Sequence, residues 1–314
     1  MRRPVIVTIV VIAALALIGG IIFAVTSGDD DDAATSETTV PETTPDETTP
    51  DETTPATDPP TEPTCAAGKT ITDGVLTIAT GEPAFPPYVV DNEPENKQGF
   101  ESAIGWAVAA EMGFDDASVT WVRTTFDEAI QPGAKNFDFN LQQYSISPER
   151  AETITFSDPY YTSNQAIVGL DGSAAEGATT LDDLKDVKFG VQTGTTSLQF
   201  VTDVIQPNPE VFVYDDNVGA KAALEANQID AIVVDLPTAF YISAVEIEGS
   251  SVIGQFPASA GGTTDEFGLV FEKDNPLVEC ANTALAALTD SGELETITEQ
   301  WMATEMGAPI IEVG

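Results

Sequence analysis

Short apolar runs alternate with helical patterns along this chain, and this alternation is the feature that most constrains its fold. Residues 75–79 predict a buried strand, and apolar side chains in 99–112 recur at helical spacing with Gly113 as a stop signal. Strand, loop and helix in this order are typical of a β-α-β series. The pattern begins again near residue 166, which predicts a second α/β unit.

The remaining elements continue this alternation. Strands are predicted at 119–122, 166–170, 187–191, 211–214, 229–234 and 267–271. Helices are predicted at 126–130, after 192–197, at 218–228, at 275–290 with Asn275 as N-cap, and in a last segment that includes Trp301. Open α/β sheets bind ligands at the carboxyl ends of their strands, where Asp235 stands. The same residue also suits the cap of a helix that begins at Leu236.

The first 26 residues have a composition of their own. An uncharged apolar run at 5–26 follows Arg2 and Arg3 and is about as long as a bilayer core requires. Because four aspartates at 29–32 stand on its other side, the run predicts a transmembrane anchor over 1–26 with everything after it outside. A cleaved signal sequence is the alternative, although its apolar core is normally shorter, about 7 to 15 residues.

Residues 27–64 are low in complexity and rich in Thr, Pro, Glu and Asp. ETTP units recur at Glu42, Glu47 and Glu52. Proline and like charges keep such a segment extended and unpacked. We therefore expect a disordered linker that tethers the folded part of the chain to the membrane.

Acidic residues dominate the folded part. After residue 64, 40 acidic residues face 9 basic ones, which leaves −31, and the whole chain carries −41 with no histidine. Nucleic acid is excluded as a partner because its phosphates would be repelled over most of this surface. An acidic surplus of this size is typical of adaptation to salt, since screening relieves the self-repulsion.

The two cysteines, Cys65 and Cys280, stand near the two ends of the folded part. Outside the cytoplasm such a pair usually forms a disulfide, and closing so long a loop stabilises a fold by about 4 to 5 kcal/mol. Two buried free thiols are the alternative. Without histidine, two cysteines supply too few ligands for a zinc or iron–sulfur site, so no metal or other cofactor is expected.

The segment SISPERAETITFSDPYY at 145–161 carries Arg150, and the only other arginine after residue 64 is Arg123. A planar guanidinium binds a carboxylate through two parallel hydrogen bonds, which a lysine cannot reproduce. Taken alone, a structural pairing of Arg150 with Glu149 or Glu152 at a turn is the favoured interpretation. The GTTS run at 194–197 enters a helix and suits an anion, although many such runs only cap helices.

Five segments of the chain, taken in sequence order, form a recognisable set of motifs. They are GFE at Gly99, SISPERAETITFSDPYY, VKFGVQTGTTS from Val187, IDAIVVD ending at Asp235, and the FGLVFEKDNPL and TDSGELETITEQW parts of the tail. Together they resemble the solute-binding proteins of polar amino-acid ABC importers, over about residues 70–305. The resemblance implies an α/β fold of the periplasmic-binding-protein type II, in which two lobes joined by two hinge crossovers close on a ligand like a flytrap.

The resemblance also implies lobes and roles. One lobe would comprise 65–161 and 264–314, and the other 165–260. Arg150 would bind the α-carboxylate of the ligand and Asp235 its α-ammonium, because a zwitterion needs a fixed cation and a fixed anion. Further contacts would come from Thr195 and Thr196 to the carboxylate, from Ser145, Gln143 and Gln192 by hydrogen bonding, from Phe85 and Phe126 around the side chain, and from Glu82 to a cationic side chain.

Three features depart from the family pattern. Ala103 stands where an aspartate is frequent, and Phe85 stands where tyrosine is frequent. Gln142 and Gln143 replace small serines, which narrows the pocket or changes its polarity. The identity of the bound amino acid therefore stays open at this point.

The sequence predicts a protein that is not an enzyme. We expect a monomer outside the cytoplasm that binds a polar amino acid and delivers it to a membrane permease and its ATPase. One alternative is a cyclohexadienyl or arogenate dehydratase, which shares the fold and would use Glu82 as a pocket acid. The other is a ligand-sensing input module, which we disfavour because no second transmembrane segment, kinase or channel follows in this sequence. Fold alone does not separate these functions.

Overall fold

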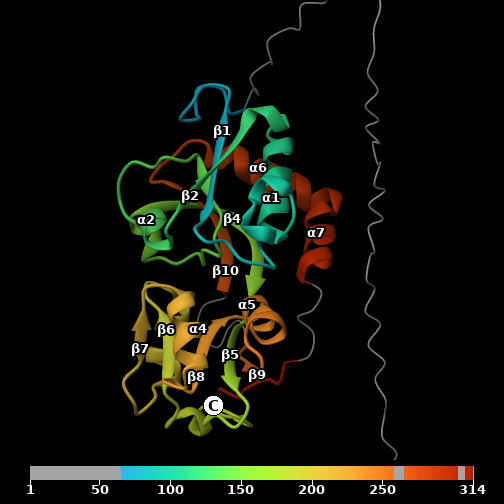
Figure 1. The fold of residues 1–314 in the computed structure, drawn as a ribbon. Coiled ribbons are helices and arrows are strands. Elements are labelled where there is room, and N and C mark those ends of the chain that lie inside the picture. The colour runs from blue at the N-terminus through green and yellow to red at the C-terminus, as the bar shows by residue number, and fades with distance from the viewer. Residues whose placement is uncertain (1–64, 258–264, 303–307, 314) are drawn as a thin grey trace, which may run out of the picture. The chain divides into compact units, whose positions relative to one another are not determined.

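The computed structural model describes residues 65–257, 265–302 and 308–313 (Figure 1). These residues form two five-stranded sheets with helices packed against them. The α/β architecture with two units, predicted from the alternating pattern, is thereby confirmed. Within the described ranges, no helix has the length and apolar character needed to span a bilayer. The predicted anchor and linker, 1–64, lie outside the described residues.

The first sheet has the strand order β2-β1-β3-β10-β4. β1 (Leu76–Gly81) pairs in parallel with β2 (Val119–Thr124) and with β3 (Phe139–Asn140). β10 (Asp265–Glu272) runs antiparallel to β3 and to β4 (Ile154–Ser163). β1 is buried along its whole length, as expected of an interior strand in a mainly parallel half-sheet.

The second sheet repeats this pairing pattern in the order β7-β6-β8-β5-β9. β6 (Phe189–Gln192) lies parallel to β7 (Phe212–Tyr214) and to β8 (Ala231–Asp235). β5 (Gln165–Leu170) runs antiparallel to β8 and to β9 (Ser250–Gln255), a strand that the sequence pattern did not predict. Only one residue separates β4 from β5, so the chain crosses directly from one sheet to the other.

Helices cover both sheets. The helices on the side of the first sheet are α1 (Phe100–Glu111), α2 (Phe126–Ile130), α6 (Val278–Ser291) and α7 (Glu293–Met302) (Figure 1). The helices on the side of the second sheet are α3 (Thr196–Phe200), α4 (Asn217–Glu225) and α5 (Leu236–Tyr241). Short 3-10 turns span Val90–Asn92, Pro94–Asn96, Asp116–Ser118, Arg150–Glu152 and Asp182–Leu184, and π-helical turns span Val201–Ile205 and Ile242–Glu246. Each sheet buries its own apolar clusters against these helices.

Two of the sequence-based boundaries are wrong. The helix expected from Asn275 begins three residues later, at Val278, although the Asn275 side chain accepts the Leu277 N–H in the turn before it. The tail was expected to stay with the first lobe through residue 314. Instead, residues 308–313 lie on the second sheet, where Ile310 pairs with Gln255 and Ile311 is fully buried.

The predicted disulfide is present. Cys65 and Cys280 are bonded, and Cys280 is buried on α6. The bond ties the first described residues to a helix that lies 215 residues further along the chain. The disulfide lies in the first lobe, outside the cavity described below.

Candidate ligand-binding site

A cavity of about 380 Å³ lies at the carboxyl ends of β1, β2, β6, β7 and β8, so both sheets contribute to its wall. Ligands bind at such strand ends in open α/β sheets. At about 30 Å³ each, roughly a dozen water molecules would fill this volume, which suits a single amino acid. The structure brings all ten residues predicted for the ligand into this one cavity: Glu82, Phe85, Phe126, Gln143, Ser145, Arg150, Gln192, Thr195, Thr196 and Asp235.

Arg150 begins the short turn before β4 and is 9% exposed. Its Nη1 donates to the Ser145 carbonyl at 2.7 Å and its Nη2 to the Gly194 carbonyl at 2.9 Å, which comes from the second sheet's side. Burial lowers the pKa of the guanidinium, yet arginine stays charged at neutral pH. None of the ion pairs among the described residues includes Arg150. Its orientation is thus fixed by neutral carbonyls, and its positive charge remains uncompensated by a direct partner.

Asp235 ends β8 and occupies the N-cap position of α5, but its side chain makes no capping hydrogen bond. It accepts instead from Gln165 Nε2 at 3.1 Å, and the same amide nitrogen donates to Asp265 at 2.6 Å. Burial, and then the nearby Asp265, raise the pKa of Asp235 well above its usual range, although Arg150 opposes this. The capping interpretation is therefore wrong, and the carboxyl group faces a place where a cation would stabilise its charged form.

The start of α3 lies beside Arg150. Thr195 is its N-cap, since its hydroxyl accepts the Leu198 N–H at 3.1 Å and donates to the Gln192 carbonyl at 2.8 Å. Thr196 Oγ1 lies 3.2 Å from Ser145 Oγ and so joins the two halves of the cavity wall. Because the Thr195 hydroxyl is already used within α3, any contact from this residue to an anion would come from its backbone N–H.

Gln143 is held by a buried acid that the sequence pattern did not single out. Its backbone has a φ of 51°, and its N–H donates to Glu101 Oε1 at 2.7 Å while its side-chain amide donates to the other carboxyl oxygen. Tyr160 donates to the same carboxyl group at 2.6 Å. Glu101 is 1% exposed, and burial raises its pKa to about 7. GFE marked the family resemblance, but nothing local showed where its glutamate would point.

The two predicted aromatic residues have different neighbours. Phe126 stacks on Tyr144 with ring centroids 4.7 Å apart, and the Arg150 guanidinium lies 5.3 Å from the Phe126 ring. Phe85 instead carries the ammonium of Lys221 at 4.6 Å from its ring centroid. Each ring thus lies against a cationic side chain of the protein, and this cation–π contact stabilises the ring and the cation.

Glu82 is less available than predicted. Its carboxylate lies 3.8 Å from Arg123 Nε and accepts from Asn92 at 3.3 Å, and its side chain is 55% exposed. A catalytic acid must reach the proton-accepting atom of the bound substrate, whereas the Glu82 side chain is mostly exposed and is held by Arg123 and Asn92. This geometry counts against the dehydratase alternative.

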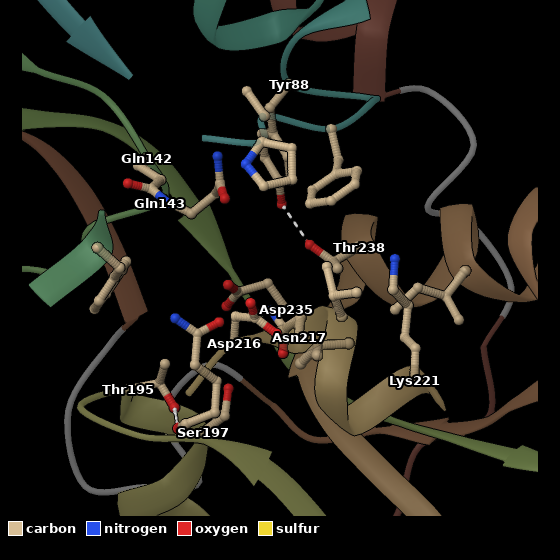
Figure 2. A pocket seen from close by; sticks show the side chains of 18 of the residues that line it. Tyr88, Gln142, Gln143, Thr195, Ser197, Asp216, Asn217, Lys221, Asp235 and Thr238 are labelled. Carbon is tan, nitrogen blue, oxygen red and sulfur yellow. Dashed lines mark hydrogen bonds between the residues drawn. The ribbon is translucent and has the colours of Figure 1, made fainter. Parts of the chain in front are cut away.

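Several lining residues were not predicted. Tyr88 and Thr238 face each other across the cavity, and the Thr238 hydroxyl donates to the Tyr88 hydroxyl at 3.3 Å (Figure 2). The other polar members that were not predicted as ligand contacts are Thr80, Thr125, Asp127, Gln142, Ser197, Asp215, Asp216, Asn217, Lys221, Tyr241 and Glu246. Of these, Lys221 carried a usable signal, since basic residues are scarce after residue 64. Within the described ranges, no group of acidic, cysteine or histidine side chains is arranged to hold a metal ion.

The fold and the cavity together define a class of protein. Two sheets of like topology, joined by the crossover from β4 to β5, contribute to one cavity with a fixed guanidinium and a fixed carboxyl group on its wall. This is the arrangement of a two-lobed binding protein for a small molecule.

Residues 76–304 match the family of bacterial extracellular solute-binding proteins, family 3, and the chain belongs to this family. It is 29% identical over 230 residues to the L-cystine-binding protein TcyJ of Escherichia coli K12, covering 72% of this chain and 82% of the relative. It is 28% identical over 237 residues to the arginine-binding periplasmic protein of Mannheimia haemolytica, covering 75% and 94%. A solved ancestral arginine-binding protein bound to glutamine is 29% identical, with a TM-score of 0.61 over 73% of this chain and 98% of that one. All three are described as binding proteins.

Proposed function

We propose that this protein binds a polar amino acid outside the cytoplasm and delivers it to the permease of an ABC importer. The observation that carries the proposal is that Arg150 and Asp235, from different sheets, line one cavity of about 380 Å³. The guanidinium suits an α-carboxylate and the carboxyl group suits an α-ammonium. The relatives support the class of ligand, since those described above bind amino acids.

In this proposal each end of the zwitterion has its own partners. The α-carboxylate lies between the Arg150 guanidinium and the first N–H groups of α3, and the α-ammonium lies against Asp235. Ser145 and Thr196 complete the wall beside the carboxylate. Binding then compensates two buried charges at once, because each gains a partner of opposite sign.

The proposed place in the cell follows from the family and from the first 64 residues. Family members are extracellular solute-binding proteins. We propose that the apolar run at 5–26 anchors the chain in the membrane and that 27–64 lets the two lobes reach the permease. Protease protection in intact cells, with detection of the mature N-terminus, tests the anchor against a cleaved signal sequence.

A thermal-shift screen of the purified protein tests the binding function. The panel comprises the twenty amino acids, ectoines and opines. A ligand that binds the native state alone stabilises it by about 2.7 kcal/mol at 100 times its Kd, so a true ligand raises the melting temperature in a concentration-dependent manner. A flat response to every amino acid contradicts the proposal, and turnover of prephenate or arogenate replaces it with the enzymatic alternative.

A further inference from the structure

Lys221 is a second cation in the cavity wall. It projects from α4, its Nζ lies 2.6 Å from Glu246 Oε1, and both residues line the cavity. The Lys221 and Glu246 side chains are only 13% and 21% exposed. Figure 2 shows Lys221 on the side of the cavity away from Thr195 and Ser197. This pair therefore stands where the far end of a bound amino acid would lie.

The Lys221 ammonium changes what the Phe85 ring can accept. It lies 4.6 Å from the ring centroid, so the position that would attract a cationic side chain already holds a positive charge. Glu82, the acid expected to meet a cationic ligand, is paired with Arg123 instead. A guanidinium or ammonium group placed at this end would face a like charge, which disfavours the wrong partner strongly in a desolvated site.

The lining residues also limit the charge of the ligand as a whole. Among the described residues that line the cavity, the cations are Arg150 and Lys221. The carboxyl groups are more numerous, namely Glu82, Asp127, Asp215, Asp216, Asp235 and Glu246. This surplus repels a ligand with an additional negative charge and attracts a cationic one, so the selection against a cationic side chain depends on the Lys221 ammonium at the far end. An uncharged oxygen acceptor avoids both penalties, because it can accept a hydrogen bond from Lys221 without adding charge.

We infer that Lys221 selects amino acids that are neutral overall and whose side chain ends in an oxygen acceptor, such as a carboxamide or ureido group, over those ending in a cation. This inference rests on the proposed amino-acid binding and names the class of ligand. Glu246 holds the ammonium in place through the ion pair at 2.6 Å. Removal of Lys221 leaves Glu246 unpaired, and the far end of the cavity then attracts a cation.

L-citrulline and L-arginine are a matched pair of probes, since they have the same shape and differ in an oxygen acceptor against a charged nitrogen donor. Calorimetry on the wild-type protein is expected to show citrulline or glutamine bound at least about tenfold more tightly than arginine. In Lys221→Met, the ratio of citrulline to arginine affinity should fall by at least about tenfold. Lys221→Arg keeps the charge and should keep the preference.

Two further variants separate selection from stability. Lys188→Met makes the same chemical change at an exposed lysine outside the cavity and should leave the ratio unchanged. Glu246→Gln retains the ammonium without its partner, so the preference against arginine should persist and binding of glutamate should improve. This second variant tests Lys221 even where Lys221→Met does not fold.

The outcomes distinguish the two hypotheses. Tighter binding of arginine than citrulline by the wild type, an unchanged ratio in Lys221→Met, or binding only of amino acids without a terminal oxygen acceptor overturns the role of Lys221 and leaves amino-acid binding intact. Failure of every amino acid to bind refutes the proposed function itself, and the selection by Lys221 with it.

Discussion

The two ends of the cavity each hold a cation and a carboxyl group, but they hold them differently. Arg150 and Asp235 come from different sheets, and neither is in an ion pair among the described residues. Lys221 lies on α4 and Glu246 on the π-helical turn Ile242–Glu246, both on the side of the second sheet, and their side chains form an ion pair at 2.6 Å. In the proposed function the first pair gains its charged partners from the zwitterion, whereas the second pair is satisfied without a ligand.

The difference separates affinity from selectivity. A buried charge without a partner is costly, so the ligand supplies most stabilisation where the protein has left charges apart. A pair that is already formed gains little from a ligand but repels a wrong charge beside it. We therefore expect changes at the Arg150 end to alter affinity for all amino acids, and changes at the Lys221 end to alter the order of preference.

Arg150→Ala is expected to have the largest effect. Affinity for the preferred amino acid should fall by about 2 to 5 kcal/mol, on the order of 30-fold to a few thousand-fold, because the α-carboxylate loses its only guanidinium. Calorimetry measures the loss, and thermal unfolding checks that the variant is folded. If Arg150→Ala binds the amino acid within a factor of about two of the wild-type affinity, then the α-carboxylate does not depend on Arg150, and the contrast between the two ends of the cavity fails.

Glu101→Gln tests the buried carboxyl group that holds Gln143 in the cavity wall. The folded pKa of Glu101 is raised from 4.5 to about 7 by burial, so the folded state binds its proton more tightly than the unfolded state. The stability contributed by protonated Glu101 is present below pH 4.5 and is lost as the pH rises through 7. Relative to Glu101→Gln, the wild-type free energy of unfolding should fall by on the order of 3 kcal/mol across this window.

Glu111→Gln is the matched control, since Glu111 is an exposed acid at the end of the same helix. Chemical unfolding at a series of pH values gives the comparison. Parallel curves for wild type and Glu101→Gln would mean that Glu101 does not titrate in this range. The Tyr160 hydroxyl donates to this carboxyl group and lowers its pKa, so loss of that hydrogen bond should move the same midpoint upward.

Asp235→Asn should change affinity and stability in opposite directions. The amide keeps the shape but cannot balance an α-ammonium, so affinity should fall by about 2 kcal/mol. The raised pKa of Asp235 means that its charged form is disfavoured in the folded protein, so the unliganded variant should be more stable than the wild type at neutral pH. Asp203→Asn, at an exposed position, is the control. A variant that loses both stability and affinity would contradict this account.

Tyr88→Phe should have the smallest effect. It removes the hydrogen bond with Thr238, which crosses the cavity between residues of the two sheets at 3.3 Å. Affinity for every amino acid should fall by about 0.5 to 1.5 kcal/mol without a change in their order. A changed order of preference would show that Tyr88 acts at the selective end of the cavity, together with Lys221.

Much of the architecture was predictable because it depends on local patterns. The helix over Phe126–Ile130 was predicted with the observed bounds, and its N-terminus has a capping box between Thr125 and Glu128. The apolar strands were predicted within a few residues, since burial on both faces leaves continuous apolar runs. The position of residues 308–313 on the second sheet was not predicted, because two isolated bridges and one buried isoleucine leave no periodic pattern in the sequence.

The sequence by itself determined the alternation of strands and helices and the hypothesis that the two cysteines pair. It gave the candidates Arg150 and Asp235 through the order of family motifs, since residue type alone left the role of each open. Only the tertiary structure decided which charges meet. Glu82 pairs with Arg123, which is 41 positions away, and Lys221 pairs with Glu246 on another helical segment. Local propensity acts over a few residues, whereas the partner of a side chain depends on how distant elements pack.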